Sequence, residues 1–322
     1  MVEIRKSVSI VIPNYNGKQL LQQHLPFTYN AIKNAGTIFE IIVVDDCSTD
    51  NSVEFIRSVY PEIILIVNSE NKGFSYAYNR GIEAAQHELI LLLNPDVKLA
   101  LDYFTDQWKY FLAWDTFGVM GRIVDMGGDH IQNAARVPKV SRLKLKTDYF
   151  YYTNNEEHRL LTFYLSGANA LINAEKLKSI GGFYERLSPF YCEEMELSIR
   201  AWRLDWQCYY EHKSVCRRQV STKIENEHDN EFYVYALHLN GLALLVWYFK
   251  ITIFDLLPNL LAGQIWIWGN YKDLYRNGRI IKKYKKSIKT LMNDNESQAT
   301  ISSVVKKIRN SVKNKRTIRF NP

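Results

Sequence analysis

Two stretches decide the fold: VSIVIPNYNG at residues 8–17 and IIVVDDCSTDNS at residues 41–52. Each opens with a run of apolar, mostly β-branched residues and then turns abruptly polar. An apolar run without alternation is typical of a strand buried on both faces of a parallel sheet. Two further runs follow, so the sequence predicts strands at Val8–Ile12, Glu40–Val44, Ile63–Val67 and Leu89–Leu93.

Helix-like segments separate these runs, which predicts an α/β fold with a mostly parallel sheet flanked by helices. Ligands of such sheets bind beyond the carboxyl ends of the strands, where this chain carries polar and acidic residues. The motif G-x-x-x-x-G-K-[ST] is missing, and so is G-x-G-x-x-G after the first strand, which excludes P-loop NTPases and dinucleotide dehydrogenases. A nucleotide held without such loops needs another phosphate ligand, such as a divalent cation on a strand-end carboxylate.

Length and composition are those of a globular chain with one large domain and an appendage, or about two units. The 322 residues are 47% hydrophobic and 23% charged, which excludes disordered and fibrous classes. Four irregularly spaced cysteines favour a reducing compartment, the cytoplasm. The run Val8–Ile12 is too short for an export signal, and the interrupted stretch Leu256–Tyr271 is too short to span a bilayer.

Positive charge is concentrated at the end of the chain, where residues 271–322 hold 15 Lys and Arg against 3 Asp and Glu. Residues 229–290 have the pattern of an amphipathic, aromatic helical extension that suits a membrane interface. Residues 291–322 are expected to form a basic tail, either solvated or in contact with an anionic partner. Aromatic residues that could stack on bases are scarce after Tyr284, so a lipid surface is favoured and nucleic acid is not expected.

Six segments together resemble the family-2 glycosyltransferases of bacterial polysaccharide synthesis. In the family's order and spacing they are VSIVIPNYNG (8–17), IIVVDDCSTDNS (41–52), NKGFSYAYNRG (71–81), LLLNPDV (91–97), SGANALI (166–172) and GGFYERLSPFYCEEMELSIRAWR (181–203). The resemblance covers about residues 7–224 and implies a GT-A fold. Residues 1–100 would form its nucleotide-sugar-binding half and residues 101–228 its acceptor-binding and catalytic half.

The resemblance places the nucleoside at Tyr15, which can stack on a base, and at Asp46, which can accept from a base N–H. Core packing is the alternative for Tyr15, and Asp50 is expected to cap the helix that follows it. Asp96 occupies the position of the family's acidic metal motif, which implies a Mg²⁺ or Mn²⁺ ion that bridges the two phosphates. The implied nucleotide-sugar pocket also includes Pro13, Asn71, Gly73, Asn79, Asn94 and Gly167.

Glu193-Glu194 lies where the family usually has Glu-Asp, and the resemblance makes Glu194 the general base of an inverting transfer. Its extra methylene would shift the carboxylate by about an ångström unless the backbone compensates. For Glu193 and Glu196 the alternative is a favourable charge at a helix N-terminus. Arg200 is expected to brace this helix.

Many family members carry a His downstream that completes the metal and diphosphate site, but residues 215–222 read VCRRQVST. Arg217 or Arg218 could instead bind the diphosphate as a fixed cation and partly replace the metal. The set Cys192, Cys208, His212 and Cys216 invites a zinc interpretation, but its spacing lacks the short C-x-x-C element, so zinc is not expected.

The sequence therefore predicts an inverting glycosyltransferase that moves a sugar from a nucleoside-diphosphate sugar to a hydroxyl of a growing, lipid-linked polysaccharide. It would work as a peripheral protein at the inner face of the cytoplasmic membrane. A second hypothesis is a non-catalytic subunit that binds nucleotide sugar or glycan, motivated by the altered base and the missing His. The retained motifs at Asp46 and Asp96 favour the enzyme.

Overall fold

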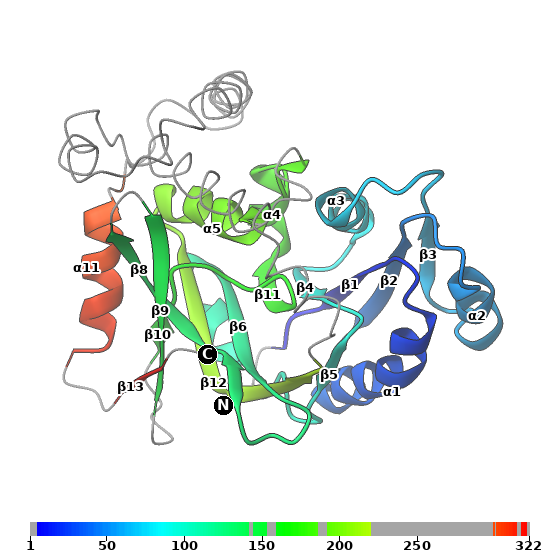
Figure 1. Ribbon diagram of the computed structural model, residues 1–322, viewed down its shortest axis with the longest axis horizontal. Helices are drawn as coiled ribbons and strands as arrows, with labels where there is room; N and C mark the ends of the chain where they lie inside the picture. Colours follow the sequence, from blue (N-terminus) through cyan, green and yellow to red (C-terminus); the bar gives the residue numbers. More distant parts are fainter. Residues whose placement is uncertain are drawn as a thin grey trace, which may run out of the picture.

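A large central sheet with helices on both faces dominates the computed structural model (Figure 1). Among the described residues its strand order is β10-β12-β6-β11-β4-β1-β2-β3, with β5 beside β12 and β7 beside β6. Strands β8, β9 and β13 form a second, smaller sheet. The structure describes residues 5–141, 144–152, 159–185, 192–219, 299, 301–313 and 317–320.

The elements of the first half are β1 Val8–Asn14, α1 Lys18–Ala35, β2 Phe39–Asp45, α2 Ser52–Val59, β3 Ile64–Val67, α3 Phe74–Ala84, β4 Leu89–Leu93 and β5 Val97–Leu99. The later elements are the short 3₁₀ helix η1 Trp108–Leu112, β6 Thr116–Val124, β7 Ile131–Asn133, β8 Ala135–Ser141, β9 Lys144–Tyr152, β10 Leu160–Leu161, β11 Asn169–Asn173, α4 Ala174–Ser179, α5 Glu193–Arg203, β12 Gln207–Arg218, α11 Ile301–Ser311 and β13 Thr317–Phe320.

All four strands expected in the first half are present, and they pair in parallel. Strand β1 is completely buried and lies between β2 and β4, while β2 also pairs with β3. The expectation that every strand is buried on both faces is wrong for β3, because β3 is the last strand of the sheet. Its residues Ile64 and Val67 are 38% and 45% exposed. The parallel register brings the carboxyl ends of β1, β2 and β4 to one edge.

Two glycines position α3 against this edge. A Cβ at Gly81 would lie 2.3 Å from a methyl carbon of Val11 on β1, so only glycine lets the helix approach the sheet this closely. Gly73 precedes the helix with φ 87°, a left-handed value that favours glycine. The start of α3 is therefore fixed beside the strand ends.

The second half continues the same sheet. Strand β11 is antiparallel to both β4 and β6, and β12 then runs parallel to β6. The expected boundary near residue 100 thus lies inside one continuous body. The far end of β12 pairs with β5, which carries Arg217 and Arg218 to the residues that follow β4.

Helix α5 is held in place by buried polar contacts. Arg200 pairs with Glu196 at 2.7 Å and donates to the carbonyl oxygens of Ile180 and Gly182. Trp202 donates its indole N–H to the carbonyl oxygen of Phe163 at 2.8 Å. These contacts fit the expected bracing role of Arg200 and fix the direction of the helix that carries Glu194.

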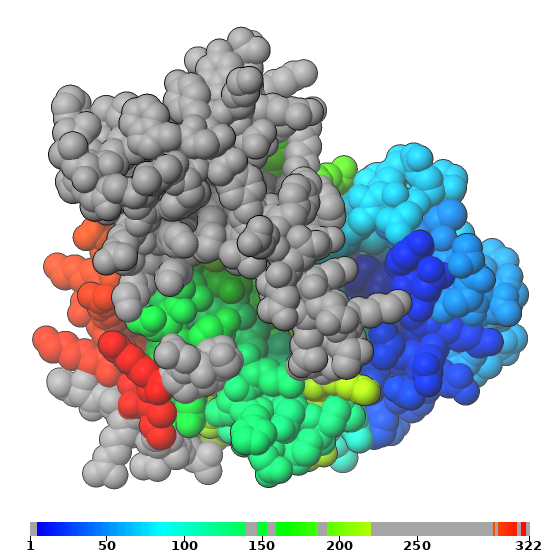
Figure 2. All heavy atoms as spheres, viewed as in Figure 1, coloured from blue at the N-terminus to red at the C-terminus, as the bar shows by residue number. Residues whose placement is uncertain are grey.

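The end of the chain is not a free basic tail over its described residues, which corrects that expectation for part of 291–322. Val304 and Ile308 of α11 are buried in the hydrophobic core, and β13 pairs with β9. The C-terminal residues, red in Figures 1 and 2, lie against the second half on the side away from β1–β3. The apolar side chains of α11 face the core, while Lys306 and Arg309 of the same helix are exposed. Strand β13 covers the edge of β9.

The expected aromatic extension at 229–290 lies outside the described residues, as does Leu256–Tyr271. Within the described residues, every helix is too short or too polar to cross a bilayer.

Substituting Ile308 tests whether α11 is structural. Ile308 is fully buried, so Ile308→Ala should lower the free energy of unfolding by about 2–4 kcal/mol. Lys306→Ala, at an exposed position of the same helix, should change it by less than about 0.5 kcal/mol. Urea unfolding followed by circular dichroism measures both, and equal small effects would show that α11 does not contribute to the core.

Candidate active site

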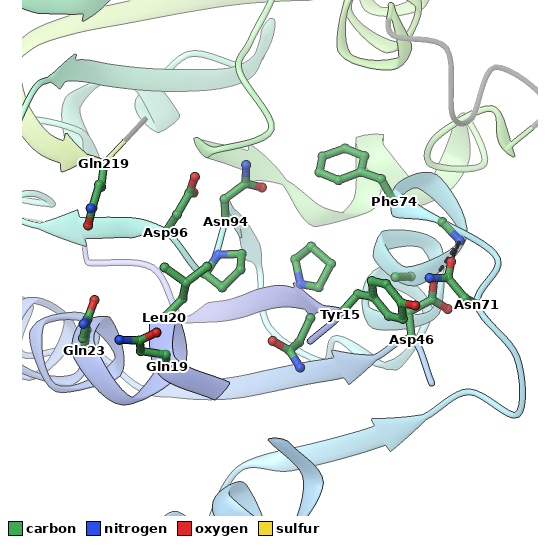
Figure 3. A pocket seen from close by; sticks show the side chains of 15 residues that line it. Tyr15, Gln19, Leu20, Gln23, Asp46, Asn71, Phe74, Asn94, Asp96 and Gln219 are labelled. Atoms are coloured by element: carbon green, nitrogen blue, oxygen red, sulfur yellow. Dashed lines mark hydrogen bonds between the residues drawn. The ribbon is translucent and has the colours of Figure 1, made fainter. Parts of the chain in front are cut away.

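A cavity of about 560 Å³ opens where the carboxyl ends of β1, β2 and β4 meet (Figure 3). Tyr15, Asp46 and Asn71 lie toward one end, Gln23 and Gln219 lie at the other, and Asp96 lies between them. The residues that line it are Pro13, Asn14, Tyr15, Gln19, Leu20, Gln23, Asp46, Asn71, Gly73, Phe74, Ala77, Asn94, Pro95, Asp96 and Gln219.

Seven of the twelve expected site residues line this cavity: Pro13, Tyr15, Asp46, Asn71, Gly73, Asn94 and Asp96. The Tyr15 side chain is 54% exposed, so it is not a core residue, and its ring is available for stacking. The other five, Asn79, Gly167, Glu194, Arg217 and Arg218, are not among the lining residues.

The Asp46 carboxylate organises the Tyr15 end of the cavity. It accepts hydrogen bonds from the Asn68 side chain at 2.8 Å and from the backbone N–H groups of Lys72 and Gly73, the latter at 2.7 Å. These bonds tie the end of β2 to the loop that starts α3. The Lys72 N–H contacts both carboxylate oxygens, at 3.2 and 3.1 Å, so protein donors already occupy most of the acceptor sites of Asp46.

Asp50 links the N-termini of two helices beside the cavity. Its carboxylate accepts from the backbone N–H of Lys18 in α1 at 2.8 Å and from that of Ser52 in α2 at 3.2 Å. Burial acts to raise the pKa of Asp50, but these hydrogen bonds and the Ser52 hydroxyl lower it overall. Asp50 therefore binds the first N–H group of each helix, although Asn51 and not Asp50 occupies the N-cap position of α2.

An ion pair joins the two halves of the sheet at the centre of the site. Arg218 Nε lies 2.8 Å from Asp96 Oδ2, and both side chains are mostly buried. The other oxygen, Oδ1, is buried and has no hydrogen-bond partner among the described residues. Burial acts to lower the pKa of Arg218, but Asp96 raises it overall, so the guanidinium stays charged.

Arg217 faces a different cavity from the one that Asp96 lines. Successive side chains of a strand point to opposite faces, so the two adjacent arginines of β12 cannot both reach one site. Arg217 is exposed and lines a second cavity with Lys98 of β5. The structure therefore separates the two arginines that the sequence treats as equivalent.

Glu194 lies at the start of α5, next to the chain segment that carries Gly167. Its Oε1 accepts from the Gly167 N–H at 2.6 Å. A Cβ at Gly167 would lie 2.9 Å from that oxygen and 3.3 Å from the ring of Phe74, which lines the cavity. Gly167 is thus close to both Glu194 and Phe74, a residue of the cavity wall.

Burial and two nearby arginines shift the pKa of Glu194 in opposite directions. Burial raises the pKa of its carboxyl group, while Arg136, the Gly167 N–H and Arg218 act to lower it, and the net shift is upward. The guanidinium of Arg136 is itself buried and stacks over Tyr164, 3.8 Å from the ring centroid. A raised pKa is the direction that suits a general base or acid near neutral pH.

Asn79 holds a turn instead of lining the cavity. Its side chain donates to the carbonyl oxygen of Phe183 at 2.8 Å and accepts from the N–H of the same residue at 2.7 Å. A Cβ at Gly182 would lie 2.4 Å from Asn79 Oδ1, so this contact also needs glycine.

The donor atoms near Asp96 fit a hard cation bound mostly by a ligand's phosphates. Oxygen atoms of Asp96 and Asn94 line the cavity, and Mg²⁺ typically takes one or two carboxylates together with substrate phosphates. Across the described ranges, no three His, Cys, Asp or Glu side chains are grouped to hold a metal. In the set weighed for zinc, His212 stacks on Tyr151, and Cys208 and Cys216 are buried.

Two features near the cavity were not predicted from the sequence: the wall that α1 forms and a buried histidine. Gln19, Leu20 and Gln23 of α1 share a helix face, and their spacing, directly after the first strand, was the available signal. His24 is 5% exposed, and neither ring nitrogen has a hydrogen-bond partner among the described residues. Burial lowers the pKa of His24, Asp96 acts to raise it, and Lys98 acts to lower it. No sequence pattern marked it.

Glu193 gives a pH-dependent test of stability. Burial and the neighbouring Glu194 raise its pKa to about 7, so the folded state prefers the protonated form. Its stabilising contribution is present below the unfolded pKa of about 4.5 and is lost as pH rises through about 7. Glu193→Gln should therefore stabilise the protein at pH 8 relative to wild type, on the order of 1–3 kcal/mol more than at pH 5.

Thermal unfolding at both pH values measures this difference. Glu175→Gln, at an exposed position of α4, is the matched control and should show the same small effect at pH 5 and pH 8. A Glu193→Gln effect that is independent of pH would contradict the assignment.

Solved structures share this fold. The mannosyltransferase PcManGT from Pyrobaculum calidifontis, in complex with GDP-Man and Mn²⁺, superposes with a TM-score of 0.51 at 17% identity, over 95% of this chain and 88% of that one. GalNAc-T7 with UDP, GalNAc and Mn²⁺ gives a TM-score of 0.51 at 15% identity, over 66% of this chain and 44% of that one. The expected GT-A fold is confirmed.

Curated relatives match over shorter stretches. An undecaprenyl-phosphate 4-deoxy-4-formamido-L-arabinose transferase of Pseudomonas savastanoi pv. phaseolicola is 38% identical over 98 residues, 29% of each chain. The putative teichuronic acid biosynthesis glycosyltransferase TuaG of Bacillus subtilis is 25% identical over 115 residues, 35% of this chain and 44% of that one. The chain thus spans less than half the length of these two relatives. A family model described as "Glycosyl transferase family 2" matches residues 9–181, more than half of the chain, and the chain belongs to this family.

Proposed function

We propose that this protein transfers a sugar, with inversion, from a nucleoside-diphosphate sugar to a hydroxyl group of a growing glycan. The observation that carries the proposal is the arrangement around one cavity: the exposed ring of Tyr15 at one end, Asp96 of the cavity wall paired with Arg218, and Glu194 in contact with Gly167 close to Phe74. Each group suits one part of such a donor and its acceptor.

The donor would lie along the cavity with its base at Tyr15 and its diphosphate near Asp96 and Arg218. An exposed tyrosine ring offers a stacking surface, and a base N–H would share Asp46 with the Lys72 N–H, which already contacts both carboxylate oxygens. A guanidinium binds phosphate oxygens through a rigid, permanently charged fork of N–H groups. Asp96 orients that fork by holding Nε, which leaves the terminal nitrogens of Arg218 to face a ligand.

A Mg²⁺ or Mn²⁺ ion on Asp96 Oδ1 would neutralise charge on the departing diphosphate. The unpartnered Oδ1 supports this, and two structural neighbours, GalNAc-T7 and PcManGT, are in complex with Mn²⁺. Arg218 supplies a second, permanent positive charge at the same place. The chain's own residues therefore provide partial charge neutralisation whether or not a cation is bound.

In the transfer step, the acceptor oxygen bonds to the anomeric carbon as the bond from that carbon to the diphosphate oxygen breaks. Glu194 takes the hydroxyl proton, and the nucleoside diphosphate leaves with the bonding electron pair. The Gly167 N–H holds one carboxylate oxygen of Glu194, which fixes the orientation of the group. The charges of Arg136 and Arg218 oppose the rise that burial causes in the pKa of Glu194.

The acceptor that we propose is a lipid-linked glycan at the inner face of the cytoplasmic membrane. Support comes from the relatives of the chain, which include an undecaprenyl-phosphate 4-deoxy-4-formamido-L-arabinose transferase and a putative teichuronic acid biosynthesis glycosyltransferase. The positive charge of residues 271–322 would favour an anionic lipid surface.

The adjacent arginines give a matched test of the donor site. Arg218→Ala should weaken nucleoside-diphosphate binding at least about tenfold, because it removes a charged phosphate donor. Arg217→Ala should leave it unchanged within about twofold, because Arg217 lines the other cavity. Calorimetric titration with UDP, GDP and dTDP, each with MnCl₂ or EDTA, measures both. Equal losses of nucleoside-diphosphate affinity in the two variants would refute the assignment of Arg217 and Arg218 to different cavities.

The two adjacent glutamates give a matched test of the base. Glu194→Gln should lower kcat by at least about 10²-fold with donor binding retained, while Glu193→Gln should keep most of the activity. The acid limb of the wild-type rate profile should lie above the ordinary glutamate range, because the pKa of Glu194 is raised and the base must be deprotonated. Release of nucleoside diphosphate with a lipid-linked acceptor pool measures the rate.

A loss of activity in Glu193→Gln but not in Glu194→Gln would identify Glu193 as the general base. Donor binding without release in wild type, under every donor and cation, would favour the non-catalytic binding subunit.

A further inference from the structure

A second cavity, of about 430 Å³, lies between α1, β5 and β12. Two cationic side chains line it, Lys98 of β5 and Arg217 of β12, together with the amide of Asn30. Its remaining lining is mostly apolar: Phe27, Leu99, Ala100, Leu101, Val215 and Cys216. It shares no lining residue with the cavity at Asp96.

Lys98 and Arg217 are directly opposite each other in the antiparallel pair of β5 and β12. Side chains at opposite positions project from the same face of a sheet, and like charges in this arrangement are destabilising. A chain selected for stability alone would place a neutral residue or a carboxylate at one of the two positions. The pair instead concentrates positive charge at one wall of a cavity.

Neither cation has a carboxylate partner within 4.0 Å among the residues that the structure describes. The carboxylate of Asp125 in the nearby turn instead accepts the backbone N–H groups of Gly128 and Asp129. The polar contact of Arg217 within this part of the chain is a long one, 3.5 Å to the carbonyl oxygen of Met126. Its N–H groups are therefore available to an added acceptor.

The position of Lys98 is fixed although it has no acidic partner. Its Nζ lies 3.9 Å from the ring centroid of Phe27, a cation–π contact that holds the ammonium at the cavity wall. Phe27 is 36% exposed and Leu101 is 60% exposed, so an apolar rim adjoins the two charges. The cavity thus joins a cationic end to an apolar end.

We infer that this cavity binds a phosphate group, and that the apolar rim receives an apolar chain attached to it. An anion between Lys98 and Arg217 would replace their repulsion with two attractive interactions, and the guanidinium can bind two phosphate oxygens at once. This site is separate from the donor cavity and does not depend on the function proposed for it. The phosphate could come from a lipid headgroup or from free phosphate.

Two soluble probes distinguish the sources: dihexanoyl phosphatidic acid, which carries a phosphate on short acyl chains, and inorganic phosphate. Binding to the full-length protein is measured by calorimetric titration for wild type and variants. We expect the lipid to bind more tightly than inorganic phosphate. Lys98→Gln and Arg217→Gln should each weaken lipid binding at least about tenfold.

Two further variants act as controls. Arg57→Gln removes a positive charge from an exposed position of α2 and should leave lipid binding unchanged. Arg218→Gln reports on the donor cavity and should also leave lipid binding unchanged. Lys98→Glu should abolish binding while folding at least as stably as wild type, because it turns a repulsive cross-strand pair into an attractive one.

Lipid binding that is lost in Arg218→Gln but kept in Lys98→Gln and Arg217→Gln would assign the phosphate to the donor cavity and overturn the proposal. Absence of binding by both probes would overturn it as well. Equal affinity for the two probes, weakened by the same two variants, would support the phosphate site and identify free phosphate as its source.

Discussion

The central position of β1 between two parallel partners is the constraint on which the site depends. Because β2 and β4 pair with β1 in parallel and in register, the three strands end at the same edge. Both faces of β1 are buried, so a shift of one residue would exchange the side chains packed on its two faces and disrupt the close contact between Gly81 and Val11. The polar residues that follow each strand are thereby brought together, although they are far apart in the sequence.

A second level of organisation comes from hydrogen-bonded carboxylates at that edge. Asp46 fixes the loop before α3, Asp50 fixes the starts of α1 and α2, and Asp96 orients Arg218 from the other half of the sheet. Each of these groups is held by protein donors, so the cavity has a defined shape without a ligand. Such preorganisation lowers the cost of binding and of charge development during reaction.

Much of this arrangement could be predicted from the sequence. The four apolar runs gave the strands of the first half, and the polar residues that follow them gave the edge at which a ligand would bind, because both depend on local pattern. The family resemblance supplied the individual site residues, including Glu194; seven of the fifteen residues that line the cavity were among them, and the family assignment is confirmed.

Features set by tertiary neighbours could not be predicted in this way. The exposure of β3 depends on its being the last strand, and the packing of α11 depends on an apolar surface formed by distant residues. Arg217 and Arg218 are chemically identical, so only the strand geometry of β12 separates them. Asn79 looked like a ligand contact because its partner at Phe183 is a backbone group that no side-chain motif marks.

The anchoring of α11 and β13 has a consequence for the folding of the chain. Both flanking segments belong to the same packed body, since β12 crosses the main sheet and α11 contacts β10. Residues separated by about eighty positions of sequence therefore close one packed body. Truncation before α11 would leave the surface that Val304 and Ile308 cover open to solvent and the edge of β9 without its β13 partner, so the last described residues contribute to folding although they lie far from the cavity at Asp96.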